Sequence, residues 1–175
     1  MLTKQTKFII AIAIQLVIIF SIIISKTAVL TGGIEVLLRI EPVDSRDPLR
    51  GDHLTFSYEI SNLDSYLFNY SPIRDGDTVY VPLKQQGRYW TAVFGVQKTK
   101  PIDKKEIFIK GKISSSYGNK IHIIYGIEDY FIPEGTGQDF IFFDFSRKKV
   151  AARVSVDKNG KAVLKKIYVN DKPWP

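Results

Sequence analysis

The hydrophobic pattern divides the chain into an apolar beginning and a longer part in which apolar and polar residues alternate. Residues 8–24 are apolar apart from Gln15 and Ser21. A run of this length is near the lower limit for crossing a bilayer, and residues 27–30 can extend it to the usual ~20 residues. We therefore predict an N-terminal transmembrane helix at 8–30.

The lysines around this helix predict its orientation. Lys4 and Lys7 precede the apolar run, and Lys26 follows it, where its long side chain can reach the membrane surface. Because lysine favours the cytoplasmic side, we expect residues 1–7 to form a cytoplasmic tail and residues 31–175 an extracytoplasmic domain. The predicted localisation is the cell membrane, with a single pass.

A cleaved secretory signal also begins with basic residues and an apolar core, so it is the competing interpretation of this segment. The core here is longer than the roughly 7–15 residues of a signal peptide. Lys26 also occupies the −3 position of the nearest small-residue cleavage site, Ala28. An uncleaved anchor is therefore favoured.

Beyond a short linker at 31–33, apolar and polar residues alternate, which is typical of strands with one buried face. Six strands are predicted, at 34–40, 54–60, 78–83, 89–97, 107–113 and 120–125. A final hairpin is predicted from 151–156 and 162–169, joined by Asp-Lys-Asn-Gly at 157–160. The many short strands and their turn residues indicate a mainly β fold, a single antiparallel β-sandwich or barrel-like domain.

One short helix is predicted near 137–148. Thr136 is a candidate N-cap, and Asp139 follows it three residues later. The phenylalanines of this segment fit a helical stripe only in part, so a strand stays open as the alternative.

Composition narrows the classes of function. The 175 residues are 45% hydrophobic, which is enough for one anchor and one compact domain. The three lysines that flank the apolar run supply part of the net charge of +7, so the domain is only mildly basic and a nucleic-acid partner is disfavoured. The absence of cysteine excludes disulfides, thiolate catalysis and cysteine-based metal sites.

Charged and turn-forming residues are densest immediately before the strand predicted at 54–60. Pro48 fixes φ and Gly51 permits positive φ, so we expect a tight, rigid connection there. The residues that we take as the candidate site are Asp44, Arg46, Asp47, Pro48, Arg50, Gly51, Asp52, His53 and Tyr58.

Metal binding by these residues is an alternative to an ion-paired loop. Asp44, Asp47 and Asp52 offer oxygen ligands of the kind that calcium prefers. Their spacing matches no known calcium loop, however, and Arg46 and Arg50 lie between them. The two histidines of the chain, His53 and His122, more often prove to be surface or core residues than metal ligands. We therefore predict an ion-paired loop, with no metal and no cofactor.

The same stretch resembles a known family. Residues 51–58, Gly-Asp-His-Leu-Thr-Phe-Ser-Tyr, are similar to the signature of the GDYXXLXY protein family of bacterial membrane-anchored proteins. His53 stands where the signature has tyrosine, and Phe56 where it has leucine. Further similar segments lie at 41–44, 47–50, 75–79, 125–135 and 157–160. The resemblance implies an anchored domain whose signature loop is residues 44–58, but it implies no activity.

A hydrolase is the enzymatic alternative. Ser45, Pro48 and the Gly-Asp pair at 51–52 are loosely similar to a box of type I signal peptidases, which are membrane-bound, β-rich Ser–Lys hydrolases. In that interpretation Ser45 is the nucleophile and a buried, neutral Lys110 is the general base. Lys112 lies on the same strand face as Lys110, which indicates solvent there instead.

The sequence therefore favours a membrane-anchored extracytoplasmic binding or assembly module without catalytic residues. The resemblance suggests a polytopic membrane protein as its partner. The hydrolase predicts that Ser45 and Lys110 lie within hydrogen-bonding distance in a cleft that faces the membrane, whereas the binding module predicts an exposed, ion-paired rim at the signature loop.

Overall fold

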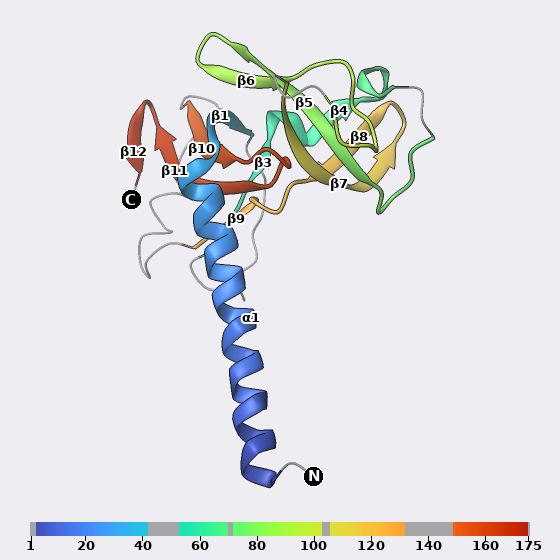
Figure 1. Ribbon diagram of the computed structural model, residues 1–175. Helices are drawn as coiled ribbons and strands as arrows, with labels where there is room; N and C mark the ends of the chain where they lie inside the picture. The colour runs from blue at the N-terminus through green and yellow to red at the C-terminus, as the bar shows by residue number, and fades with distance from the viewer. Residues whose placement is uncertain (1–2, 42–52, 70–71, 103–105, 132–148, 175) are drawn as a thin grey trace.

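A long helix carries a domain built of short antiparallel strands (Figure 1). The structure, a computed structural model, describes residues 3–41, 53–69, 72–102, 106–131 and 149–174. The mainly β fold with its antiparallel sheets confirms the predicted fold class. The helix predicted near 137–148 lies outside the described residues.

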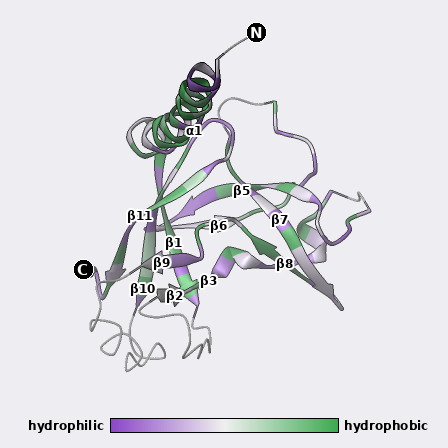
Figure 2. Cartoon of the chain, turned by 90° about the horizontal axis from the view of Figure 1, so that it is seen from below, coloured by the Kyte–Doolittle hydropathy of each residue, from purple (hydrophilic) through white to green (hydrophobic). Residues whose placement is uncertain are grey.

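Helix α1 spans Lys4–Gly32 and projects away from the domain, with the N-terminus at its far end (Figure 1). Thr3 caps it by accepting a hydrogen bond from the Thr6 amide. The helix has the length and apolar composition of a membrane span, and the green of its hydrophobic residues covers most of it in Figure 2. Val29 is its only buried residue. The linker predicted at 31–33 is wrong, because the helix continues to Gly32.

In the part of the chain that the structure describes, the strands form two five-stranded sheets and one two-stranded sheet. The first sheet has the order β12-β11-β10-β1-β3, the second β4-β8-β7-β5-β6, and the small one pairs β2 with β9. Their bounds are β1 Ile34–Glu41, β2 His53–Thr55, β3 Ser57–Tyr58, β4 Asn62–Asp64, β5 Thr78–Gln86, β6 Tyr89–Ala92, β7 Ile107–Tyr117, β8 Lys120–Ile124, β9 Asp129–Phe131, β10 Val150–Val156, β11 Ala162–Val169 and β12 Lys172–Trp174. Two 3₁₀ turns, η1 (Glu59–Ser61) and η2 (Ser65–Leu67), flank β4.

One apolar core joins the two large sheets, as the alternating patterns require. The first sheet contributes Leu38 and Val154, and the second contributes Ile109 and Ile123, all of them fully buried. Strand β1 buries alternate side chains in this core, namely Val36, Leu38 and Ile40, so its register follows from the sequence pattern.

Two strand predictions are wrong in extent. The strand expected at 54–60 is two short strands in different sheets followed by η1, since residues 53–55 pair with β9 whereas residues 57–58 pair with β1. The strand expected at 89–97 ends at Ala92, and Val96 and Gln97 form only isolated bridges.

The predicted final hairpin is confirmed as β10 and β11, but its turn is longer than a two-residue Asn-Gly turn. The Asp157 carboxylate accepts from the Asn159 and Lys161 amides, and only Gly160 has a positive φ, of 78°. A two-residue turn with both central residues at positive φ lies further on, between β11 and β12, at Asn170 and Asp171. Both central residues of a type I′ hairpin require that conformation.

Candidate functional site

Two buried tyrosines bind the ends of the two large sheets together. The Tyr58 hydroxyl, on β3, donates to the Ile127 carbonyl at 2.5 Å. The Tyr125 hydroxyl, directly after β8, donates to the Ile60 carbonyl, also at 2.5 Å. Each tyrosine thus donates to the carbonyl two residues beyond the other tyrosine. We call this reciprocal pair of hydrogen bonds the tyrosine clasp.

Burial keeps both phenols of the clasp neutral. Desolvation raises the pKa of Tyr58 far above its usual value, and the charges of Glu128 and Asp129 raise it further. Desolvation is also the main cause of the raised pKa of Tyr125, with a contribution from Glu128. The clasp is therefore a pair of neutral donors at physiological pH, suited to structural support and not to proton transfer.

A carboxylate fixes the turn on which the clasp depends. Glu128 accepts hydrogen bonds from the Tyr125 amide at 2.5 Å and the Gly126 amide at 2.7 Å. Gly126 has φ of 77°, a conformation that favours glycine. The Glu128 carbonyl accepts from the Phe56 amide at 2.8 Å. Segment 56–60 and segment 125–128 are thus joined by side-chain and backbone hydrogen bonds together.

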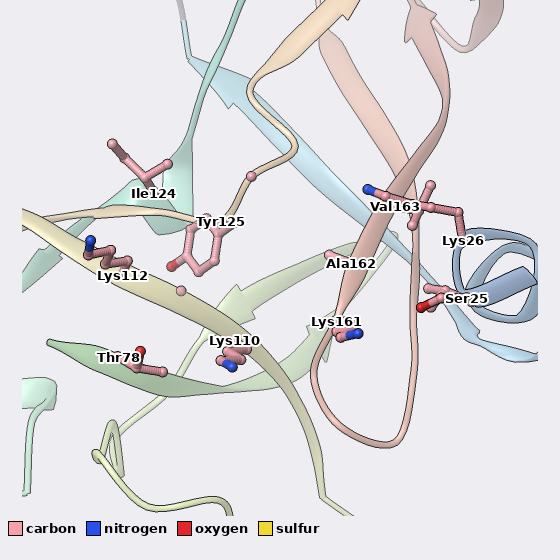
Figure 3. Close-up of a pocket in the computed structure, with 13 residues that line it drawn as sticks. Ser25, Lys26, Thr78, Lys110, Lys112, Ile124, Tyr125, Lys161, Ala162 and Val163 are labelled. Atoms are coloured by element: carbon pink, nitrogen blue, oxygen red, sulfur yellow. The ribbon is translucent and has the colours of Figure 1, made fainter. Parts of the chain in front are cut away.

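A cleft of about 480 Å³ opens on one side of the clasp, between helix α1 and strands β7 and β11. Lys26 lines it from α1, Lys110 and Lys112 from β7, and Lys161 from the turn directly before β11 (Figure 3). The Tyr125 ring lies between these strands, with its hydroxyl turned toward the protein interior. We call this site the lysine cleft.

A second cleft, of about 580 Å³, opens on the other side of the clasp and is polar in character. His122 Nδ1 lies 2.8 Å from Asn62 Oδ1, and the Asn62 amide donates to Glu41 at 3.5 Å. The hydroxyl of Ser57, which also lines this cleft, is buried without a hydrogen-bond partner. Among the described residues no group of three or more His, Asp or Glu side chains could hold a metal ion.

Helix α1 is fixed to the domain at the edge of the lysine cleft. The Ser155 hydroxyl donates to the Val29 carbonyl at 2.6 Å, and the Gly33 amide donates to the same carbonyl at 3.0 Å. A Cβ at Gly33 would lie 2.4 Å from Ser155 Oγ, so only glycine fits this close approach. Because β1 starts at Ile34, no free linker separates the helix from the sheet.

Comparison with family models identifies the chain. The model of the GDYXXLXY protein family matches residues 15–167. The chain belongs to the GDYXXLXY family. No curated protein and no solved structure matches it. The resemblance inferred from the signature is thereby confirmed, and the matched range includes most of α1 and all but the last strand of this GDYXXLXY protein.

Most of the signature loop of this GDYXXLXY protein lies outside the described residues. The undescribed part comprises Asp44, Arg46, Asp47, Pro48, Arg50, Gly51 and Asp52, together with Ser45. The backbone of His53 pairs with Phe131 in the small sheet. Tyr58, the last residue of the signature, is fully buried in the clasp. The ion-paired rim expected of a binding module therefore stays a prediction, whereas the position of Tyr58 is determined.

Lys110 does line a cleft beside the helix, as the hydrolase interpretation expects, but its environment differs from that of a buried base. The side chain is exposed, and the backbone amide of Lys110 donates to the Gly160 carbonyl at 2.8 Å. Lys112 lines the same cleft, in agreement with the expectation that both lysines reach solvent. A neutral lysine base requires an apolar enclosure, which this open cleft does not supply.

Neither the tyrosine clasp nor the lysine cleft was predicted from the sequence. Tyr125 was the end of a predicted strand, and nothing in its neighbours indicated that its hydroxyl would meet a carbonyl 65 positions earlier. The lysines of the cleft come from a helix, a strand and a turn that are distant in sequence. The only local signal was the pair Lys110 and Lys112, which alternate on one strand face.

Proposed function

We propose that this GDYXXLXY protein is a single-pass, N-in anchor whose extracytoplasmic domain acts as a binding or assembly module for a polytopic membrane protein. The observation that supports the proposal most is the amide of Gln15, which lies in the middle of the apolar run. Its side chain is exposed and has no hydrogen bond to any part of the described chain.

Gln15 lies on the same face of α1 as the attachment to the domain. Gln15 and Val29 are separated by just under four helical turns, so their side chains point within about 40° of each other. Ala11 lies five turns from Val29 and directly beneath it on that face. Small residues and a polar amide on one face are typical of a surface that packs against another membrane helix.

The rigid attachment of the domain to α1 determines where a partner on this face of the helix would lie. Because Ser155 and Gly33 fix Val29 to the sheet, a partner helix on the Gln15 face would also lie beneath the β10–β11 side of the domain. One partner could therefore contact the helix and the domain together. A flexible linker would not constrain the two contacts in this way.

Site-specific photo-crosslinking in membranes tests the proposal. A crosslinker at Ile18, on the Gln15 face, should capture a larger membrane protein, and one at Phe20, on the opposite face, should not. Gln15→Leu should weaken capture from Ile18 by about threefold or more, the value of a typical interhelical hydrogen bond. Equal capture from both faces, or capture only of a second copy of this chain, would contradict the proposal.

Orientation and anchoring have a separate test. Reporter fusions at the C-terminal end should be active only outside the cytoplasm, and the mature protein should keep its N-terminus. A cytoplasmic reporter signal from the C-terminal end, or a mature N-terminus near Val29, would refute the N-in, uncleaved anchor.

The alternative, a Ser–Lys hydrolase with Ser45 as nucleophile and Lys110 as base, is kept for one reason, which is that Lys110 lines a cleft beside α1. A serine-reactive fluorophosphonate probe separates the two functions. We expect no labelling of the full-length chain. Labelling that disappears in Ser45→Ala and in Lys110→Ala would make the hydrolase the better proposal.

A further inference from the structure

The four lysines of the lysine cleft have no counter-ion. None of Lys26, Lys110, Lys112 and Lys161 forms an ion pair or a side-chain hydrogen bond, in the part of the chain that the structure describes. Three lysines elsewhere are ion-paired: Lys98 with Asp77 at 2.6 Å, Lys120 with Asp64 at 2.9 Å, and Lys165 with Glu35 at 2.8 Å. Four unpaired lysines therefore share this one cleft.

Two acidic residues close to the lining residues are committed to backbone amides. Among the residues that the structure describes, no carboxylate lines the cleft. Glu128 accepts from the Tyr125 and Gly126 amides, and Asp157 accepts from the Asn159 and Lys161 amides. Four like charges around one concave site repel one another and raise the local potential, so an anion bound there is stabilised.

The position of the cleft along α1 restricts the kind of anion. Ser25 and Lys26 form one wall, and they follow the apolar run that ends at Ile24 directly. At a rise of 1.5 Å per residue, this wall begins within about 3 Å of the end of the apolar run along the helix axis. The apolar run covers about 26 Å of a hydrocarbon core of about 30 Å, so this wall lies at the hydrocarbon boundary, from which the long Lys26 side chain can reach the lipid phosphates.

The cleft also has apolar walls that suit the glycerol end of a lipid. Ala162 and Val163 of β11 are half-buried, and Ile124 of β8 keeps 43% of its surface exposed. The hydroxyls of Ser25 and Thr78 provide neutral donors beside the lysines. A small soluble anion would use the lysines alone, whereas a phospholipid would use the lysines and the apolar walls.

We propose that the lysine cleft binds the phosphate of an anionic membrane phospholipid. The proposal rests on the membrane anchoring proposed above but not on the partner helix. A bound lipid would add a second contact with the bilayer and so resist tilting of the domain on its helix. The group that the cleft recognises is a phosphate ester, and a membrane lipid carries it.

Lipid titration of the full-length protein in non-ionic detergent, read by native mass spectrometry, tests the proposal. The probes are phosphatidylglycerol and phosphatidylcholine of matched chain length. Wild-type protein should bind phosphatidylglycerol more tightly. A juxtamembrane lysine contributes about fivefold to such binding, so Lys110→Gln with Lys161→Gln should weaken it by about 25-fold.

A matched variant controls for net charge. Lys84→Gln with Lys166→Gln removes two exposed lysines that line neither cleft, and it should leave phosphatidylglycerol affinity within about twofold of wild type. Equal losses in the two double variants would refute a specific site in favour of non-specific attraction.

Two further outcomes would also overturn the proposal. Glycerol phosphate or inorganic phosphate that binds as tightly as the lipid would make the site one for a soluble phosphate ester. No preference for phosphatidylglycerol over phosphatidylcholine would refute the phosphate site itself. Because crosslinking from Ile18 does not depend on these lysines, failure here leaves the partner proposal separately testable.

Discussion

Removal of either hydroxyl of the tyrosine clasp should destabilise the domain. Tyr58→Phe takes a donor from the Ile127 carbonyl, and Tyr125→Phe takes one from the Ile60 carbonyl, with little change in volume. A buried hydrogen bond contributes about 1 kcal/mol, and a carbonyl left without a donor adds to the loss, so each variant should lose about 1–2 kcal/mol. For a domain of this size that lowers Tm by about 3–8 °C.

The reciprocal geometry makes a sharper prediction for the double variant. Each tyrosine holds the backbone segment that carries the other, because Ile60 lies two residues after Tyr58 and Ile127 two residues after Tyr125. Loss of one bond should therefore weaken the other. We expect Tyr58→Phe with Tyr125→Phe to lose less than the sum of the two single losses, by about 0.5 kcal/mol or more.

Thermal unfolding of the full-length chain in detergent, followed by near-UV circular dichroism, measures all three variants. Tyr117→Phe is the matched control, since Tyr117 is 90% exposed and should melt within about 0.5 kcal/mol of wild type. Single variants that melt like the control would refute the energetic role of the clasp. Strict additivity would show that the two bonds act independently.

Two further predictions concern the clasp in alkali and the attachment of the helix. Because the folded-state pKa values of Tyr58 and Tyr125 are raised by burial, their contribution is complete below the unfolded value near 10 and is lost as pH rises above it. Wild type should therefore lose Tm more steeply between about pH 10 and 11 than Tyr58→Phe with Tyr125→Phe, and parallel pH profiles would contradict this. Gly33→Ala should destabilise the helix–domain attachment by about 1–3 kcal/mol through its contact with Ser155, whereas Gly32→Ala, which meets nothing within 4 Å, should not. Limited proteolysis at the junction and Tm measure this difference, and equal behaviour of the two variants would refute it.

Local patterns in the sequence predicted the elements whose signals are local. The apolar run predicted α1, and the alternation at 151–156 and 162–169 predicted β10 and β11 with nearly correct bounds. Elements that depend on distant contacts were missed or misjudged. β9 is three residues long and exists by pairing with β2, so its own sequence carries too little periodicity to be recognised.

The candidate site was also predicted only in part, because its hydrogen-bond partners are distant in sequence. Tyr58 was singled out because it closes the signature, but the sequence alone did not predict that its hydroxyl would be buried against a carbonyl 69 positions away. The alternation that placed Phe56 and Tyr58 on one buried face was correct, even though the strand itself is broken. Burial followed from periodicity, whereas the hydrogen-bond partner required the fold.

The direction of the Tyr125 side chain indicates that fold stability and ligand binding depend on different residues in this protein. Its ring lines the lysine cleft, while its hydroxyl is held inside by the Ile60 carbonyl and is not free to contact a ligand. The proposed recognition of a lipid phosphate therefore relies on the lysines, with the Ser25 and Thr78 hydroxyls beside them. It follows that Tyr125→Phe should reduce stability but keep lipid selectivity, whereas Lys110→Gln with Lys161→Gln should do the reverse, because these exposed side chains form no ion pair or hydrogen bond with the described chain. A Tyr125→Phe variant that stays folded but loses its preference for phosphatidylglycerol would refute this separation and would assign the hydroxyl a role in binding.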